Sequence, residues 1–267
     1  MKEEGEKTQR KKWVYTRQQY ENRYGFEDGK TYVWEVSQEV KPLHYDLGKT
    51  QIFNGKCEII EEEKKENDGE RAPWMEIALG IAKEMKGCEE SKEPMYSKAK
   101  SYLRYCGNQY EPTDGVNGPW CAAFMNWCIG QTINSKTSKP YKHSKSASSQ
   151  APLNNEKYIK IEEPIYGSIV VYRKASDGTG HTGFLYGKTT SGEYILLGGN
   201  QDQTVRFDAY GEYTSSSKTK KLYGFYIPAD YEVKEIDKLK DTDIYANEDV
   251  VNSKYGITII KSTGKTN

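Results

Sequence analysis

The chain has 267 residues, enough for one large domain or for one domain with additional segments. Lysine plus arginine and aspartate plus glutamate each total 39, so the formal net charge is zero. No basic excess therefore points to nucleic acid as a partner, and no acidic block suggests a solvating tail. The mean hydropathy of −0.90 indicates a modest core, so we expect the 22 tyrosines to supply much of the buried surface.

Residues 1–70 form an N-terminal accessory region that is rich in tyrosine and in charge. Alternation over residues 32–36 predicts a strand, and Asn54-Gly55 is typical of a hairpin turn. The charged residues 61–70 favour a solvated linker, with a binding surface as the alternative. The start of the chain lacks an apolar segment, so we expect no secretory signal. No stretch approaches the ~20 apolar residues of a membrane span.

Three helices are predicted in the middle of the chain. Residues 73–86 place one set of apolar side chains on a single face, namely Trp74, Ile77, Ala78, Ile81, Ala82 and Met85. Residues 94–105 predict a second helix that buries Tyr96, Ala99 and Leu103. The third follows Gly118-Pro119 and has amphipathic spacing at Cys121, Phe124, Met125, Cys128 and Ile129.

A loop over residues 135–150 leads to four or five predicted strands between residues 169 and 227. Helices followed by a series of strands indicate the α+β class. Residues 255–260 predict one more strand. We expect that strand to pair with the N-terminal strands in a small accessory β element.

One cysteine and one histidine stand out chemically. Cys121 begins its helix, where unpaired backbone N–H groups and the helix dipole favour a nucleophilic thiolate. Of the three histidines, His44 and His143 lie in loop-like segments, whereas His181 follows a Gly-rich turn and opens a strand. Asn200 ends the next strand and is placed to accept the His181 ring N–H, which would fix its tautomer.

Each residue also has a structural interpretation. Cys121 fits buried filling on a helix, His181 fits a strand edge, and Asn200 fits a turn. The five cysteines include no metal-binding spacing, so we expect no metal and no cofactor. Four of them fit ordinary thiols, with a Cys88–Cys106 disulfide as the alternative.

The motifs resemble those of a known family. The segment Pro-Trp-Cys-Ala-Ala-Phe-Met-Asn-Trp-Cys over residues 119–128 resembles the nucleophile segment of CHAP-type amidohydrolases/peptidases, a branch of the papain-like NlpC superfamily. The similarity is to the subgroup with Trp-Cys-Ala-Ala-Phe and Gly-Gly-Asn-Gln motifs, found in phage lysins and bacterial cell-wall hydrolases. It covers residues 73–228 through further segments, in order 73–78, 166–172, 180–184, 197–201 and 223–227.

The resemblance implies a papain-like core with the nucleophile helix packed on an antiparallel sheet. Residue by residue, it implies Cys121 as nucleophile, His181 as general base and Asn200 as the orienting third residue. Many relatives have Glu where this chain has Gly198, which leaves the orienting role to Asn200. Trp120 and Gln201 are candidate substrate contacts. Residues 71–228 would be the catalytic domain, with 229–267 as a C-terminal extension.

The implied activity is cysteine-dependent hydrolysis of an amide bond in the peptidoglycan stem peptide or cross-bridge. Either an N-acetylmuramoyl-L-alanine amidase or an endopeptidase would use this chemistry, as a phage lysin or an interbacterial effector. We expect it to be made in the cytoplasm and to reach the wall by non-Sec export or lysis. Peptidoglycan is the expected partner, with a cognate immunity protein for an effector. The alternatives are a catalytically silent wall-binding module and a structural component.

Overall fold

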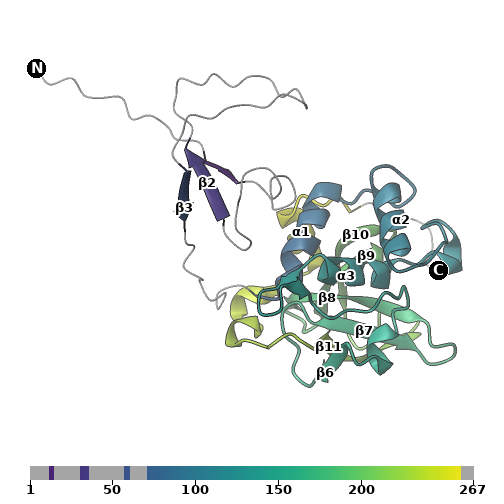
Figure 1. Ribbon diagram of the computed structural model, residues 1–267. Coiled ribbons are helices and arrows are strands. Elements are labelled where there is room, and N and C mark those ends of the chain that lie inside the picture. Colours follow the sequence, from purple (N-terminus) through teal and green to yellow (C-terminus); the bar gives the residue numbers. More distant parts are fainter. Residues whose placement is uncertain (1–11, 15–30, 36–56, 61–70, 260–267) are drawn as a thin grey trace, which may run out of the picture. The chain divides into compact units, whose positions relative to one another are not determined.

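The computed structural model describes residues 12–14, 31–35, 57–60 and 71–259 (Figure 1). The chain divides into two compact units, Met1–Asn67 and Asp68–Asn267. The first contains an antiparallel sheet in the order β1-β2-β3, formed by Lys12–Val14, Thr31–Glu35 and Cys57–Ile60. The strand expected over residues 32–36 is confirmed for residues 32–35. The expected Asn54-Gly55 turn and the charged residues 61–70 lie outside the described residues.

Two of the helices in the second unit begin at prolines and agree with the sequence expectation. Helix α1 spans Trp74–Met85 and has Pro73 at its N-cap. Helix α2 spans Met95–Tyr105 and has Pro94 at its N-cap. Proline suits this position because a helix start leaves its backbone N–H groups unpaired. In α2 the buried aromatic residue is Tyr102, whereas Tyr96 is half-buried.

Helix α3, Cys121–Gly130, differs from the expected amphipathic helix. All five residues of the predicted apolar face are buried, but Ala122, Ala123 and Asn126 on its other sides are buried too. The reason is tertiary, because α3 contacts α1 and α2 as well as strands β8 and β9. A helix enclosed in this way has no solvent-facing side to record in its sequence pattern.

Five long strands occupy residues 169–228, as the sequence predicted. They are β7 Ile169–Lys174, β8 Gly180–Thr189, β9 Tyr194–Gln201, β10 Thr204–Tyr210 and β11 Lys220–Pro228. With β6, Tyr158–Ile161, they form an antiparallel sheet in the order β10-β9-β8-β7-β11-β6, and β12, Ile244–Tyr245, adds to β8 in parallel. A small hairpin pairs β4 with β5, Ile133–Asn134 with Lys139–Pro140. Short 3₁₀ helices span Gly115–Asn117, Ala151–Asn154, Glu235–Asp237 and Asp241–Asp243.

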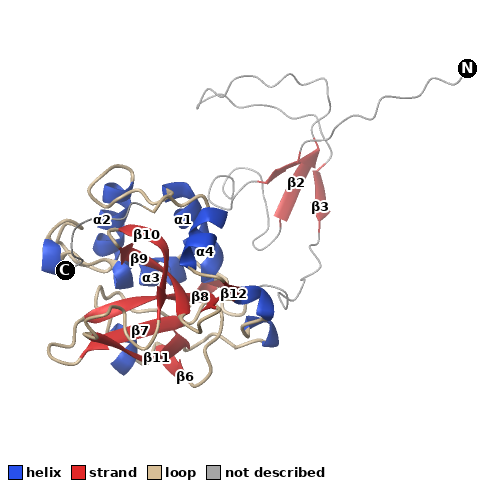
Figure 2. Cartoon of the chain, turned by 180° about the vertical axis from the view of Figure 1, so that it is seen from behind, coloured by secondary structure: helices blue, strands red, loops and turns tan. Residues whose placement is uncertain are grey.

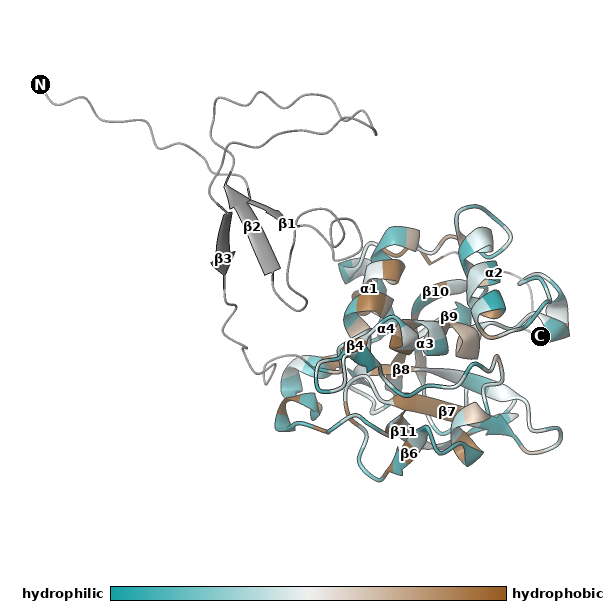
Figure 3. Ribbon diagram, in the orientation of Figure 1, coloured by the Kyte–Doolittle hydropathy of each residue, from teal (hydrophilic) through white to brown (hydrophobic). Residues whose placement is uncertain are grey.

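The core lies mainly between the sheet and helices α1, α2 and α3, with apolar colour concentrated on α1 and β7 (Figure 3). A smaller cluster forms on a separate surface of the sheet from Val170, Tyr172, Leu185, Leu196 and Phe225. Helices packed on an antiparallel sheet confirm the α+β class predicted from the order of elements.

The C-terminal part of the described chain corrects one prediction. Residues 255–259 contain no strand, and the preceding residues form helix α4, Glu248–Lys254 (Figure 2). The Asn252 side chain accepts from the Phe207 N–H at 3.0 Å and donates to the Phe207 carbonyl at 2.8 Å. The Asn252 amide thus makes the pair of backbone hydrogen bonds to β10 that a neighbouring strand would make. Helix α4 therefore packs on the same sheet to which β12 adds.

Within the described residues, no helix combines the length and apolar character needed to cross a membrane.

Candidate functional site

Cys121 lies where helix α3 meets strand β9. A Cβ added to Gly199 of β9 would come within 2.4 Å of the Trp120 ring and 2.8 Å of the Phe124 Cβ. Only a residue without a side chain allows this approach. Gly199 therefore brings the amino-terminal end of α3 against the sheet, beside the start of β8, which carries His181.

The environment of Cys121 favours its thiolate. Burial by itself would raise the pKa of the Cys121 thiol. A hydrogen bond and the positive charge of His181, together with the backbone N–H groups of Thr182 and Ala122, outweigh burial and lower this pKa. The Cys121 and His181 predicted from the sequence are thus brought together, although they are 60 residues apart in the chain (181 − 121).

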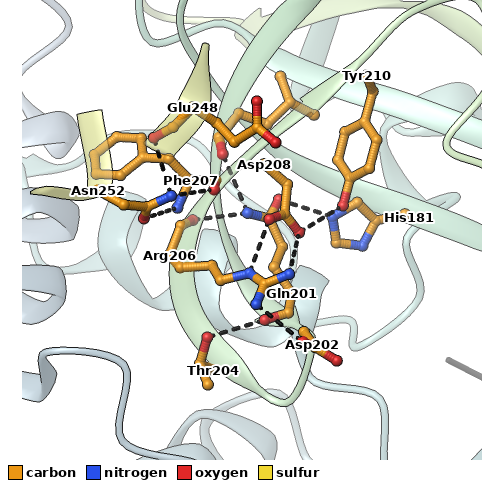
Figure 4. Close-up of polar contacts among 11 residues, drawn as sticks. His181, Gln201, Asp202, Thr204, Arg206, Phe207, Asp208, Tyr210, Glu248 and Asn252 are labelled. Carbon is orange, nitrogen blue, oxygen red and sulfur yellow. Dashed lines mark hydrogen bonds and ion pairs between the residues drawn. The ribbon is translucent and has the colours of Figure 1, made fainter. Parts of the chain in front are cut away.

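His181 is oriented by Gln201 (Figure 4). The His181 Nε2 lies 3.1 Å from the Gln201 Oε1. The Gln201 NH₂ group donates to the carbonyls of Leu196 at 3.1 Å and Arg206 at 2.7 Å, which assigns the amide oxygen to the side facing His181. Nε2 must therefore donate, which in the neutral ring leaves Nδ1 as the unprotonated nitrogen.

Gln201, rather than Asn200, is the carboxamide that contacts His181. Asn200 has a φ of 54° beside an irregularity in the β9–β10 pairing, and its side chain makes no hydrogen bond with any residue that the structure describes. A Cβ at Gly198 would lie 2.7 Å from the Gln201 Oε1. Gln201 thus occupies space that a side chain at position 198 would need. In the sequence, the glycine at position 198 was the signal that Gln201, and not Asn200, would contact His181.

A charged network supports this arrangement from strand β10 (Figure 4). The Arg206 guanidinium pairs with Asp202 at 2.9 Å and with Asp208 at 2.8 Å. The Tyr210 hydroxyl donates to Asp208 at 3.0 Å, and its ring packs edge-on against the His181 ring with centroids 5.8 Å apart. Tyr210 thus covers the imidazole while Asp208 holds its hydroxyl in place.

Cys121 lines a cavity of about 320 Å³, although only 4% of its surface is exposed. The other walls come from Pro119, from Ser148 and Ser149, and from the β7–β8 turn over residues 177–180. Hydrogen bonds from Lys174 and Thr179 hold the pKa of Asp177 well below its usual range, so its carboxylate stays charged. A larger cavity of about 520 Å³ elsewhere on the unit is not lined by Cys121, so the smaller one is the candidate site.

Trp120, a candidate substrate contact, is fully buried. Its indole N–H donates to the Glu90 carboxylate at 2.5 Å, and its ring packs near Tyr102 and Phe124. Gln201, the other candidate, is 1% exposed and bonded to His181. Both positions support roles inside the protein, in packing for Trp120 and in orienting the imidazole for Gln201.

Cys106 and Cys128 differ from Cys121 in the direction in which their pKa is shifted. Cys88 and Cys106 are free thiols, so the alternative disulfide is absent. Burial raises the pKa of Cys106 to about 11 and raises that of Cys128 well above its usual value. No group of histidine, cysteine and acidic side chains within the described residues is arranged to hold a metal ion.

Fold and site together define an α+β protein with a cysteine, a histidine and a carboxamide in contact. Comparisons with models of known protein families, with curated proteins and with solved structures returned no match for this chain.

Proposed function

We propose that this chain is a cysteine-dependent hydrolase with a papain-like core that cleaves an amide bond of peptidoglycan. The observation that carries the proposal is that His181 interacts with Cys121 on one side and with Gln201 on the other, while Cys121 lines a surface cavity. A thiol with a lowered pKa, an oriented imidazole and access for a ligand are the requirements of nucleophilic catalysis by cysteine.

In the first step, His181 Nδ1 holds the proton of Cys121, and the thiolate attacks the carbonyl carbon of the scissile amide. A C–S bond forms and the carbonyl oxygen becomes an oxyanion. The Cys121 backbone N–H lies at the start of α3, where helix N–H groups have no partner inside the helix, and in this mechanism it donates to the oxyanion. His181 then gives its proton to the amide nitrogen, the C–N bond breaks, and the amine leaves behind a thioester.

In the second step, water replaces the amine. His181 takes a proton from this water as the oxygen attacks the thioester carbonyl. The C–S bond breaks, the sulfur leaves as thiolate and the carboxylic acid product departs. Gln201 keeps the same hydrogen bond to Nε2 throughout, so the imidazole exchanges protons only through Nδ1.

The assignment of the substrate to peptidoglycan rests on the motif resemblance over residues 73–228. The scissile bond would belong to the stem peptide or the cross-bridge, cleaved as an amidase or an endopeptidase would. The protein would act at the wall as a lysin or an interbacterial effector. An effector of this kind requires an immunity protein that protects the cell that makes it.

The decisive experiment incubates purified peptidoglycan sacculi with the full chain and identifies released muropeptides by mass spectrometry. We expect new amine and carboxyl ends at one type of amide bond. Cys121→Ala should release none while keeping the circular dichroism of the parent. Cys106→Ala is the matched control, because it removes a buried thiol that does not line the cavity at Cys121, and it should retain activity.

Equal release by the parent and Cys121→Ala would overturn the proposal. Binding of sacculi with no release by either protein would favour the catalytically silent wall-binding module instead.

A further inference from the structure

The larger cavity of the second unit has a chemical character of its own. It measures about 520 Å³ and lies among the start of α1, the middle of β8, β12 and the end of α4. Three tyrosines line it, Tyr166, Tyr186 and Tyr245. Tyr186 lies five residues beyond His181 on β8, which corresponds to about 17 Å of extended strand. The cavity is therefore separate from the one at Cys121.

The tyrosine hydroxyls in and beside this cavity form a connected network. The Tyr186 hydroxyl lies 2.9 Å from that of Tyr255 and accepts from Tyr245 at 3.4 Å. The Lys254 ammonium approaches the same oxygen at 3.4 Å. Burial, together with hydrogen bonding between its hydroxyl and those of Tyr245 and Tyr255, raises the pKa of Tyr186, which keeps its hydroxyl neutral. Neutral hydroxyls both donate and accept, so the network suits a ligand that does the same.

The charges around this cavity cancel. Both guanidinium nitrogens of Arg71 that face Asp243 are paired with its carboxylate, at 3.0 and 2.8 Å. The Arg71 guanidinium also stacks on the Tyr166 ring at 4.0 Å from its centroid. The other two charged residues of the cavity lining are Lys254 and Glu76, which have opposite charges. Neither has an ion-pair partner among the described residues. An anion or a cation would therefore meet both an attractive and a repulsive charge.

A ligand that matches these features is neutral, rich in hydroxyls and apolar on its faces. A pyranose sugar has these properties, because its ring faces present C–H groups and its edge presents hydroxyls. Aromatic rings with a polar edge complement both parts. Leu79 adds an apolar wall that suits the methyl group of an N-acetyl substituent.

We propose that this cavity binds a saccharide of the N-acetylhexosamine class and holds the glycan strand of the wall while Cys121 acts on an attached peptide. The identification with wall glycan rests on the proposed function. Saccharide binding itself does not, because the residues that carry it are separate from Cys121, His181 and Gln201.

The test uses the full chain with Cys121→Ala, so that no peptide bond is cut, and titrates it calorimetrically with chitotetraose. We expect saturable binding. Tyr245→Ala and Leu79→Arg should each weaken it by about tenfold or more, through loss of a stacking ring and through obstruction of the cavity. Tyr223→Ala is the matched control, since Tyr223 is a 47% exposed tyrosine on β11 outside this cavity. It should change affinity by less than about twofold.

A second measurement uses the chain with an intact Cys121. The same two cavity variants should raise KM for sacculi, while the rate of Cys121 alkylation by iodoacetamide stays that of the parent. Absence of chitotetraose binding by a folded chain would overturn the inference. So would unchanged affinity in both cavity variants, or tighter binding of citrate or inorganic phosphate at the same residues. Sugar binding without muropeptide release would retain this inference and reject the proposed function. Muropeptide release without sugar binding would retain the proposed function and reject this inference.

Discussion

His143 and His181, both in the second unit, each have a ring nitrogen held by a fixed oxygen, but they differ in their other neighbours. His143 Nδ1 lies 2.7 Å from the Tyr141 carbonyl, and its Nε2 lies 2.5 Å from the Tyr105 hydroxyl. His181 likewise has one nitrogen bonded to a fixed oxygen, that of Gln201. In both rings the proton position is set by a neighbour. An imidazole with a fixed tautomer is therefore no evidence of catalysis by itself.

The two histidine regions differ in the pKa of their thiol, which is Cys106 for His143 and Cys121 for His181. Cys106 follows Tyr105 at the end of α2, and burial raises its pKa to about 11, with only partial opposition from the Lys145 charge. Cys121 is also buried, yet its pKa is lowered because His181 and two backbone N–H groups are directed at the sulfur. The comparison teaches that burial alone keeps a thiol protonated, and that hydrogen-bond donors decide whether it becomes a nucleophile.

The largest expected effect separates the two histidines. His181→Ala removes the general base and should lower the rate of muropeptide release by about 10²–10⁴-fold. His143→Ala removes the hydrogen bonds to the Tyr105 hydroxyl and the Tyr141 carbonyl and should lower Tm. The rate per folded molecule should remain close to that of the parent. Rates are measured on sacculi and normalised to the folded fraction from circular dichroism. Comparable losses in both variants would remove the distinction between the two sites.

The next effect separates the two neighbouring carboxamides. Gln201→Leu removes a hydrogen bond to an imidazole that becomes charged, worth about 1.5–3 kcal/mol, and should lower kcat by roughly 10–150-fold. Asn200→Ala should change kcat by less than about threefold, because the Asn200 side chain makes no hydrogen bond with the described residues. Steady-state kinetics on soluble muropeptides measures both. A larger loss for Asn200→Ala would restore the role that its position in the motif suggested.

A smaller effect separates the two thiols through pH. Alkylation follows the thiolate fraction, so it rises with pH through the pKa of each cysteine. Cys121 should react at neutral pH at least about tenfold faster than Cys106, whose reaction should rise only toward pH 11. Peptide mass spectrometry after brief iodoacetamide treatment across a pH series resolves the two. In the His181→Ala chain the Cys121 profile should move to higher pH, and an unmoved profile would argue against the contact.

The smallest effect concerns Glu90, which anchors Trp120 next to Cys121. Burial raises the pKa of Glu90, although its hydrogen bond from Trp120 acts in the opposite direction. A carboxyl whose folded-state pKa is raised contributes stability below its unfolded-state pKa, and this contribution is lost as pH rises through the folded-state value. Glu90→Gln keeps an acceptor for the indole without the charge. It should raise Tm at neutral pH by no more than about 2–4 °C and lose this advantage in acid. Thermal scans at several pH values test this, and a lower Tm at neutral pH would contradict it.

Much of the site could be predicted from local sequence. Pro73 and Pro94 marked two helix starts, and the Gly-rich turn before His181 marked a strand start. Gly118-Pro119 correctly located the start of α3 at Cys121. These signals are local because proline and glycine act through their own backbone geometry, whatever surrounds them.

The choice between Asn200 and Gln201 was not local. It depends on a reversal of the chain in which Asn200, Asp202 and Gln203 adopt positive φ, and on the empty position at Gly198 that Gln201 fills. The same holds for residues 255–259, whose apolar alternation is typical of a strand but which follow α4 in a segment without strand pairing.

The amino-acid sequence by itself determined the α+β class, the helix starts and the identity of a cysteine and a histidine suited to react together. Only the tertiary structure decided which amide orients that histidine and which cysteine has its pKa lowered. It also decided that the tyrosines of β8 and β12 share a cavity. The physical reason is that backbone preferences act between near neighbours in the chain, whereas hydrogen-bond geometry and desolvation depend on groups that only folding brings together.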